Sequence, residues 1–287
     1  MPDNDYRQHS VQCISARGLH RLAWYEWGDP ANPHAVLCAH GLTRCGRDFE
    51  PLARALASRY RVICPDFPGR GASDRLVDPT EYQVPVYVAD IVTLIARLNV
   101  QVLDWVGTSM GGLIGMTLAS LPGQPLRRLV INDVGAVLQA GALQRIGSYV
   151  GKNPRFDTHD QAVAYLRGIH APFGPHSDAQ WRFLTEISLR ALPDGGFQLH
   201  YDPAIANAFA GDAVAHDVDL WAIYDRLRLP VLLTRGAESD LLPRAIAAQM
   251  TTRGPCARLV EFAGVGHAPT FFQDDQIRAV SEFLSAC

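Results

Sequence analysis

The stretch "LDWVGTSMGGLIGMTLA" (103–119) sets one serine, Ser109, among glycines where one apolar run ends and another begins. The first run is of strand type and the second of helical type, so we expect Ser109 at a sharp strand-to-helix turn. Such a turn projects the hydroxyl clear of the sheet and presses the residues two before and two after it against neighbouring backbone. Gly107 and Gly111 fill those positions, which a helix-capping serine would not require, so the pattern favours a nucleophile. Gly112 is not needed by the turn, and we assign it to close packing of helix on sheet.

Strand-type and helical segments alternate on both sides of this turn. Predicted strands lie at 20–28, 34–41, 60–66, 100–107, 126–135, 229–236 and 257–264, and predicted helices at 49–58, 84–99, 109–122, 244–252 and 274–285. Alternation of this kind is typical of a parallel sheet covered by helices. We therefore expect an α/β fold with a mostly parallel central sheet.

The alternation stops after Gly135 and resumes about eighty residues later. The intervening sequence has helical pieces, such as 160–169 and 179–192, and no clear strand. A helical block inserted into an α/β core is typical of a lid. The predicted division is a core of residues 1–135 and 217–287 with a helical lid of residues 136–216. The aromatic residues of the lid line a substrate pocket or pack the lid on itself, and both interpretations stay open for Trp181, Phe183, Phe197 and Tyr201.

A serine hydroxyl becomes a useful nucleophile only when a base takes its proton, so a histidine is required. His267, in "FAGVGHAPTFF" (262–272), follows the last predicted strand and precedes the last predicted helix. In the chain order of nucleophile, acid and base, it is the histidine placed late enough. We therefore predict His267 as the general base.

The carboxylate that orients this histidine should follow a strand between the two. Glu238 and Asp240 come just after the predicted strand 229–236, and we favour Asp240 because it lies at the far end of the loop. Asp133, at the end of the predicted strand 126–135, is the alternative acid. Either carboxylate could instead cap a helix or carry a surface charge.

Ester hydrolysis also needs hydrogen-bond donors for the oxyanion. We predict the backbone N–H of Met110, directly after the nucleophile, and that of Leu42, in the loop "HGLTRCGRDF" (40–49). In the same loop we interpret His40 as structural rather than catalytic. Arg44 either binds a substrate carboxylate or pairs with a carboxylate of the protein such as Asp66 or Asp74, and we favour the pairing.

Composition limits the partners. The net charge of −3 and the absence of a Lys/Arg stripe argue against nucleic-acid binding. The N-terminal residues are polar and acidic without an apolar segment, and no apolar stretch is long enough to span a bilayer, so we expect neither secretion nor a membrane partner. The six cysteines are irregularly spaced without a CxxC pair, which favours a reducing cytoplasm.

No cofactor or metal is expected from the motifs. "GRGASD" (69–74) and "GVGHAP" (264–269) each hold a G-x-G, but neither has the third glycine of a dinucleotide site. The chain has no Walker loop, no HExxH and no Cys/His cluster with metal-ligand spacing. The sequence favours no particular oligomeric state.

Taken together, the motifs resemble the α/β-hydrolase superfamily over almost the full chain, and within it the serine esterase and enol-lactonase branch with a helical lid. The matching pieces, in the order of the family, are "HGLTR" (40–44), "CPDFPGRGASD" (64–74), "VGTSMGG" (106–112), "LLTRGAESDLL" (232–242) and "GVGHAP" (264–269). The resemblance implies Ser109 as nucleophile, His267 as general base and then acid, and Asp240 as its orienting partner. It also implies an acyl-enzyme intermediate on Ser109 that is hydrolysed by water.

The expected function is therefore cleavage of a small carboxylic ester or lactone. Carbon–carbon bond hydrolases of this fold commonly carry tryptophan after the catalytic histidine, where this chain has Ala268, which disfavours that alternative. A cofactor-free dioxygenase or perhydrolase on the same fold is a second alternative. A non-catalytic binding protein is a third, although it would not need a serine, an acid and a histidine together.

Overall fold

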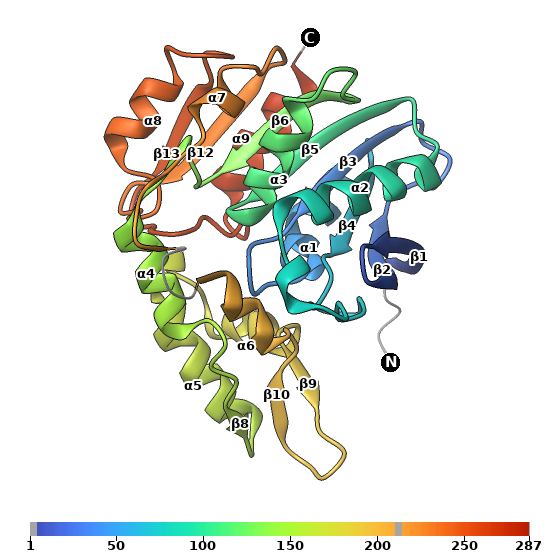
Figure 1. Ribbon diagram of the computed structural model, residues 1–287, viewed down its shortest axis with the longest axis vertical. Coiled ribbons are helices and arrows are strands. Elements are labelled where there is room, and N and C mark those ends of the chain that lie inside the picture. Colours follow the sequence, from blue (N-terminus) through green and yellow to red (C-terminus); the bar gives the residue numbers. More distant parts are fainter. Residues whose placement is uncertain (1–4, 210–213, 287) are drawn as a thin grey trace.

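An eight-stranded sheet forms the centre of the computed structural model, which describes residues 5–209 and 214–286 (Figure 1). The strand order is β1-β2-β4-β3-β5-β6-β12-β13. The strands are β1 (Arg7–Ser15), β2 (Gly18–Trp27), β3 (His34–Ala39), β4 (Arg61–Asp66), β5 (Val102–Thr108), β6 (Leu126–Asn132), β12 (Val231–Gly236) and β13 (Arg258–Phe262). β2 pairs antiparallel with β1 and β4, while the pairings from β4 to β13 are parallel. The predicted α/β fold with a mostly parallel sheet is confirmed.

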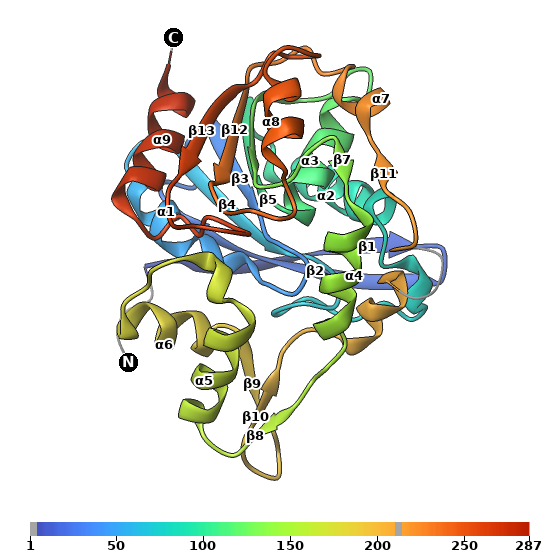
Figure 2. The ribbon, with the colours of Figure 1, turned by 90° about the vertical axis from the view of Figure 1, so that its left-hand side faces the viewer.

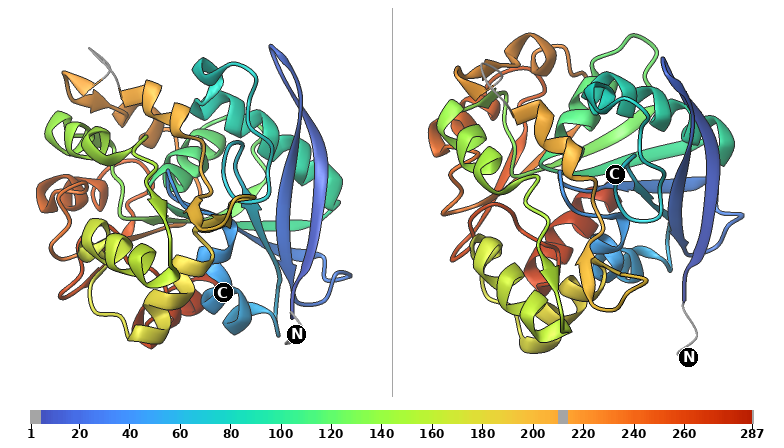
Figure 3. Two further views of the ribbon diagram at one scale, coloured as in Figure 1. Left: turned by 90° about the horizontal axis from the view of Figure 1, so that it is seen from below. Right: turned by 60° about the horizontal axis from the view of Figure 1, so that its bottom comes forward.

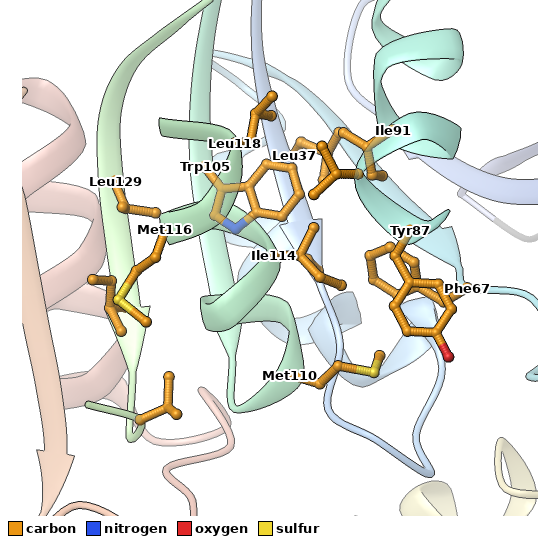
Figure 4. Packing of buried hydrophobic residues seen from close by; sticks show 14 of the residues in the cluster. Leu37, Phe67, Tyr87, Ile91, Trp105, Met110, Ile114, Met116, Leu118 and Leu129 are labelled. Carbon is orange, nitrogen blue, oxygen red and sulfur yellow. The ribbon is translucent and has the colours of Figure 1, made fainter. Parts of the chain in front are cut away.

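Helices cover both faces of this sheet (Figure 2). They are α1 (Glu50–Leu56), α2 (Val84–Leu98), α3 (Met110–Ala119), α7 (Trp221–Tyr224), α8 (Arg244–Met250) and α9 (Asp274–Ser285), with short 3₁₀ helices at Gly46–Phe49 and Pro79–Glu81. In β3, Leu37 belongs to the apolar cluster shared with α2 and α3, whereas its neighbour Cys38 belongs to the cluster shared with α1 and α9. Side chains alternate across a strand, so β3 supplies both layers of the core. Figure 4 shows the first layer, in which Leu37, Ile91, Trp105 and Ile114 lie together.

The sequence analysis predicted β2, at 20–28, but missed the edge strand β1. Residues 7–15 form β1, whose side chains are mostly exposed and which pairs with β2 along its whole length. Figure 3 shows this hairpin in dark blue along one side of the molecule. An edge strand with little burial shows no apolar alternation, which is why its sequence looks like a polar terminus.

The segment of residues 137–219 is here called the insertion, and its described residues, 137–209 and 214–219, lie beyond the carboxyl ends of the parallel strands (Figure 1). The insertion contains α4 (Ala140–Tyr149), α5 (His159–Ile169), α6 (Asp178–Glu186), 3₁₀ helices at Ala171–Phe173 and Pro203–Phe209, and strands β7 (Val137–Leu138), β8 (Arg155–Phe156), β9 (Leu189–Ala191), β10 (Phe197–Leu199) and β11 (Val218–Asp219). β8, β10 and β9 form a small sheet, and β7 pairs with β11 where the insertion begins and ends. The expectation of no strand here was wrong, because strands of two or three residues are too short to show a period.

Capping decides where two helices of the insertion begin. Thr158 and Ser177 each accept a hydrogen bond from the backbone N–H three residues on, and the glutamine at that position bonds back to the cap residue. Each pair satisfies backbone donors that a helix start leaves free. The helix expected at 179–192 ends at Glu186, and residues 189–191 form β9 instead.

The predicted division into a core and a lid of residues 136–216 stays a prediction. Residues 210–213 of that lid, and residues 1–4 and 287 of that core, lie outside the described residues. Trp181 packs against Leu184, Ile187 and Cys45, with Phe183 beside them, so these aromatic side chains join the insertion to itself and to the core.

Gly111→Ala should destabilise the fold strongly. A Cβ at Gly111 would lie 2.0 Å from the carbonyl oxygen of Ala39, which is backbone of β3 and cannot turn aside. We expect the free energy of unfolding in urea, followed by circular dichroism, to fall by about 1–3 kcal/mol, the usual cost of overpacking.

Gly168→Ala is the matched control. Gly168 lies inside α5, and a Cβ there would meet nothing within 4 Å. Because alanine favours a helix over glycine, this variant should be unchanged or more stable by about 0.5–1 kcal/mol. Equal losses in the two variants would contradict the close contact of α3 with β3.

Candidate active site

Ser109 occupies the turn between β5 and α3 in a backbone conformation that side-chain-bearing residues rarely adopt, with φ 53° and ψ −115°. Its backbone N–H donates to the carbonyl oxygen of Asn132 at 2.9 Å, which fixes the turn to the end of β6. Its hydroxyl makes no capping hydrogen bond to α3. The helix-cap alternative therefore does not describe this serine.

His267 lies beside the Ser109 hydroxyl and joins it to a buried carboxylate. The distance from His267 Nε2 to Ser109 Oγ is 3.0 Å, and that from His267 Nδ1 to Asp133 Oδ2 is 2.7 Å. Asp133 is fully buried and also accepts hydrogen bonds from the backbone N–H of Gly236 at 2.9 Å and the hydroxyl of Ser239 at 2.6 Å. These contacts hold the Asp133 carboxylate toward the imidazole.

Asp240, the favoured acid of the sequence analysis, does not reach His267. Its side chain is half exposed and accepts hydrogen bonds from Nε and Nη2 of Arg145, at 2.5 and 2.9 Å. The alternative, Asp133, is the carboxylate that contacts the histidine. The loop after β12 does reach the site, since Ser239 donates to Asp133, but the Asp240 side chain is directed to Arg145, whereas Asp133, the residue after β6, faces His267.

The two residues that carry the predicted oxyanion donors lie at the same cavity as Ser109. Leu42 and Met110 line the same cavity as Ser109, and Met110 is the first residue of α3, where a backbone N–H has no acceptor within the helix. Arg70, which the sequence analysis did not single out, holds both. Its Nε donates to the carbonyl oxygen of Leu42 at 2.8 Å, and its Nη2 lies 3.6 Å from Met110 Sδ. The role of the two N–H groups stays a proposal.

Arg70 is fully buried and its other contacts are equally fixed. Nη1 donates to the carbonyl oxygen of Pro68 at 2.7 Å and to the hydroxyl of Tyr87 at 2.8 Å. The motif "GRGASD" lies in one of the pieces that resemble the family, but its arginine carries no sequence signal that sets it apart from a surface arginine.

His40 and Arg44 shape the loop that carries Leu42. His40 is buried, accepts from the backbone N–H of Phe67 at 2.9 Å and lies 2.7 Å from the carbonyl oxygen of Gly41, in agreement with a structural role. Arg44 pairs with a protein carboxylate as favoured, but the partner is Asp48, at 2.6 and 2.8 Å, rather than Asp66 or Asp74. Nη1 of Arg44 also donates to the hydroxyl of Ser188 in the insertion, at 2.7 Å.

Two cavities of different character meet at Ser109. The larger, of about 340 Å³, is lined mainly by apolar side chains, among them Leu113, Leu143 and Ile205. The smaller, of about 60 Å³, contains His267, Arg44, Arg145, Tyr149 and His170. Burial, together with the nearby Arg44 guanidinium, lowers the pKa of His170 well below its ordinary value, so this imidazole is neutral at neutral pH.

One cluster elsewhere has the residue types of a metal site. Ligand atoms of Cys13, His20 and Asp90, all buried, lie within 4.8 Å of one another. His20 Nε2 lies 3.0 Å from Asp90 Oδ2. Burial raises the pKa of the Cys13 thiol to about 12, and the His20–Asp90 contact is a hydrogen bond within the core. Among the described helices, none is long and apolar enough to cross a membrane.

Known proteins resemble this chain over most of its length. The family model described as the alpha/beta hydrolase family matches residues 36–282. The 3-hydroxybutyrate-oligomer hydrolase of Cupriavidus necator is 51% identical over 282 residues, 96% of each chain. The 2-(acetamidomethylene)succinate hydrolase of Mesorhizobium japonicum is 28% identical over 88% of each chain. A crystal structure of an alpha/beta hydrolase from Novosphingobium aromaticivorans superposes with a TM-score of 0.86 at 35% identity, covering 98% of each chain.

Asp133→Asn and Asp240→Asn should differ in their effect on catalysis, which identifies the carboxylate that orients His267. An amide at position 133 cannot stabilise the charged imidazole and favours the wrong tautomer, so kcat for an ester such as p-nitrophenyl butyrate should fall by about 10³–10⁴-fold. Asp240→Asn should keep kcat for this neutral ester within about twofold. Steady-state rates of the two purified variants, measured side by side, check this, and the reverse ranking would restore Asp240 as the acid.

Stability should fall below about pH 6.5. Burial lowers the pKa values of His40 and His170 well below 6.5, so the unfolded chain takes up protons there that the folded chain refuses. Burial also raises the pKa of Asp66 to about 6, and this group acts in the opposite direction because the folded chain holds its proton. Burial likewise lowers the pKa of His200, to about 3, and that of His176, while it raises the pKa of Asp90. The four histidines outnumber the two aspartates, so we expect the free energy of unfolding to fall by roughly 1–3 kcal/mol from pH 6.5 to 5.

Urea titrations across this pH range measure that slope. His40→Asn should make it shallower by up to about one proton, whatever its effect on stability at pH 8. His216→Asn, at an exposed position, is the control and should leave it unchanged. A slope that is flat in the wild type, or the same in His40→Asn, would contradict the neutral buried imidazole.

Proposed function

Because the chain belongs to the alpha/beta hydrolase family, we propose that it is a serine hydrolase that cleaves a small carboxylic ester or lactone through an acyl-enzyme on Ser109. The observation that carries the proposal is the chain of contacts from Ser109 Oγ through His267 to Asp133, at 3.0 and 2.7 Å. A nucleophile, a base and an orienting acid in hydrogen-bond reach of one another are the requirement for this chemistry.

The reaction follows from the positions of these groups. His267 Nε2 takes the proton of the Ser109 hydroxyl as its oxygen attacks the ester carbonyl, and Asp133 stabilises the imidazolium from the Nδ1 side. The backbone N–H groups of Leu42 and Met110 would hold the oxyanion. His267 then gives the proton to the leaving alcohol, and a water activated by the same imidazole releases the acyl group.

The substrate we propose is an ester of short hydroxy acids. The 51% identical relative is named a 3-hydroxybutyrate-oligomer hydrolase, and an oligomer of this kind is joined by the carboxylic esters that such a site cleaves. The apolar cavity of about 340 Å³ next to Ser109 is large enough for a short alkyl chain to leave water.

We place this activity in a reducing cytoplasm. Five cysteines are free thiols: Cys13, Cys38, Cys45 and Cys64 are buried, and Cys256 is exposed. Disulfides are common in secreted proteins, so these free thiols favour a reducing compartment. No nucleic acid, membrane or cofactor is part of the proposal.

Ser109→Ala should abolish the reaction. Loss of the nucleophile should lower the release of 3-hydroxybutyrate from its dimer and trimer by at least about 10³-fold and prevent labelling by a fluorophosphonate. Ser281→Ala, on the outer helix α9, is the control and should label and turn over as the wild type does. If the wild type neither labels nor hydrolyses these oligomers or p-nitrophenyl esters, the proposed function is wrong.

A further inference from the structure

The smaller of the two cavities at Ser109 contains the imidazole that must protonate the leaving group. His267 lines this cavity but not the larger apolar one, whereas Ser109 lines both. The leaving oxygen receives its proton from His267, so the alcohol part of the ester belongs in the smaller cavity. The acyl part then occupies the apolar cavity, on the other side of the scissile bond.

Two arginines line the smaller cavity, and they differ in what they bind. Arg44 is buried, and its three guanidinium nitrogens are occupied by Asp48, the carbonyl oxygen of Leu184 and the hydroxyl of Ser188. Its charge is matched inside the protein, and it bridges the core to the insertion. Arg44 is therefore a structural cation.

Arg145, on α4 of the insertion, is paired with a half-exposed carboxylate. Nε and Nη2 donate to Asp240, and the hydroxyl of Tyr149, in the same cavity, is the other polar group beside the guanidinium. The side chains of Arg145 and Asp240 are 38% and 50% exposed. An ion pair this exposed contributes little to stability, so a second carboxylate can take over the guanidinium at small cost. The planar fork of arginine suits such a carboxylate.

We propose that Arg145 binds the carboxylate of the leaving group, which it takes over from Asp240 when substrate enters, so that the enzyme prefers esters whose alcohol part is a hydroxy acid with a free carboxyl group. The inference rests on the proposed function and specifies its substrate. A cavity of about 60 Å³ suits a short leaving group, so an oligomer is shortened from its carboxyl end, one hydroxy acid at a time. His170, neutral in the same cavity, adds no competing charge.

The test compares one ester bond with and without the charge. The substrates are the 3-hydroxybutyrate dimer as the free acid, the methyl ester of that dimer, and p-nitrophenyl butyrate. Arg145→Gln should lower kcat/KM for the free acid by about 10–100-fold, the usual effect of losing a charge-assisted hydrogen bond. The two neutral esters should change by less than about twofold, which also shows that the variant is folded.

Arg145 could bind substrate, or it could serve only to join α4 to the loop between β12 and α8 through its ion pair with Asp240. Two further variants distinguish these roles. Asp240→Asn breaks the same ion pair but leaves the guanidinium, so kcat/KM for the free acid should be unchanged or higher. Arg190→Gln, which removes a cation of the insertion located on β9, is the matched control and should leave the ratio of free acid to methyl ester as it is in the wild type. Equal losses on acid and methyl ester in Arg145→Gln, or a loss of acid preference in Asp240→Asn, would overturn the inference.

The product pattern gives an independent readout. With the 3-hydroxybutyrate trimer, the first products should be monomer and dimer, and the monomer should come from the carboxyl end. A trimer labelled in its carboxyl-terminal unit measures this, because the label should appear first in the monomer. Release of the labelled unit within a dimer would contradict the assignment. If the wild type cleaves all three esters without preference, only the role of Arg145 fails. If it cleaves none, the proposed function fails as well.

Discussion

The contact between the first turn of α3 and the backbone of β3 and β5 is the constraint on which the rest of the site depends. A Cβ at Gly107 would lie 2.2 Å from the carbonyl oxygen of Gly111, and one at Gly111 would lie 2.0 Å from that of Ala39. The helix can start this close to the strands only without side chains at these positions. This approach turns the chain so sharply that Ser109 must adopt a positive φ, and its hydroxyl is directed to His267 instead of to its own helix. Gly112 serves the packing we expected, because its Cβ would lie 2.6 Å from the side chain of Val134.

The sequence predicts those parts of the molecule that depend on local order along the chain. The strand–helix alternation, the turn at Ser109 and the position of His267 after β13 all follow from residues that are neighbours in sequence. The acid does not, because Asp133 and Asp240 both follow a strand, and they differ in their partners, His267 for the first and Arg145 for the second. Contacts between side chains about 100 residues apart are a long-range property that a single sequence does not display. The same limit hid β1, since an exposed edge strand leaves no apolar pattern.

Buried arginines are a second feature that local sequence does not reveal. Lys152 is the single lysine of the chain, and arginine supplies the remaining positive charge. A guanidinium can donate in several directions within one plane, which lets Arg70 hold the loop of Leu42 and the start of α3 together, and lets Arg44 join the core to the insertion. A lysine ammonium on a flexible stem would fix neither geometry as well. These side chains give the loops around Ser109 a rigidity that loops alone do not have.

The pairing of β7 with β11 has a consequence for how this chain can change over evolution. The two short strands bring the ends of the insertion together at one place, Val137 opposite Asp219. We call this two-strand pairing the neck of the insertion. The entropic cost of closing a loop grows only with the logarithm of the loop's length. Once the neck has formed, residues can therefore be added to or removed from the segment between its two strands at little thermodynamic cost. Ser109, Asp133 and His267 all come from outside the neck, whereas Arg145 lies within it. Lengthening or exchanging the segment between the two strands could therefore give new selectivity to an unaltered reaction centre.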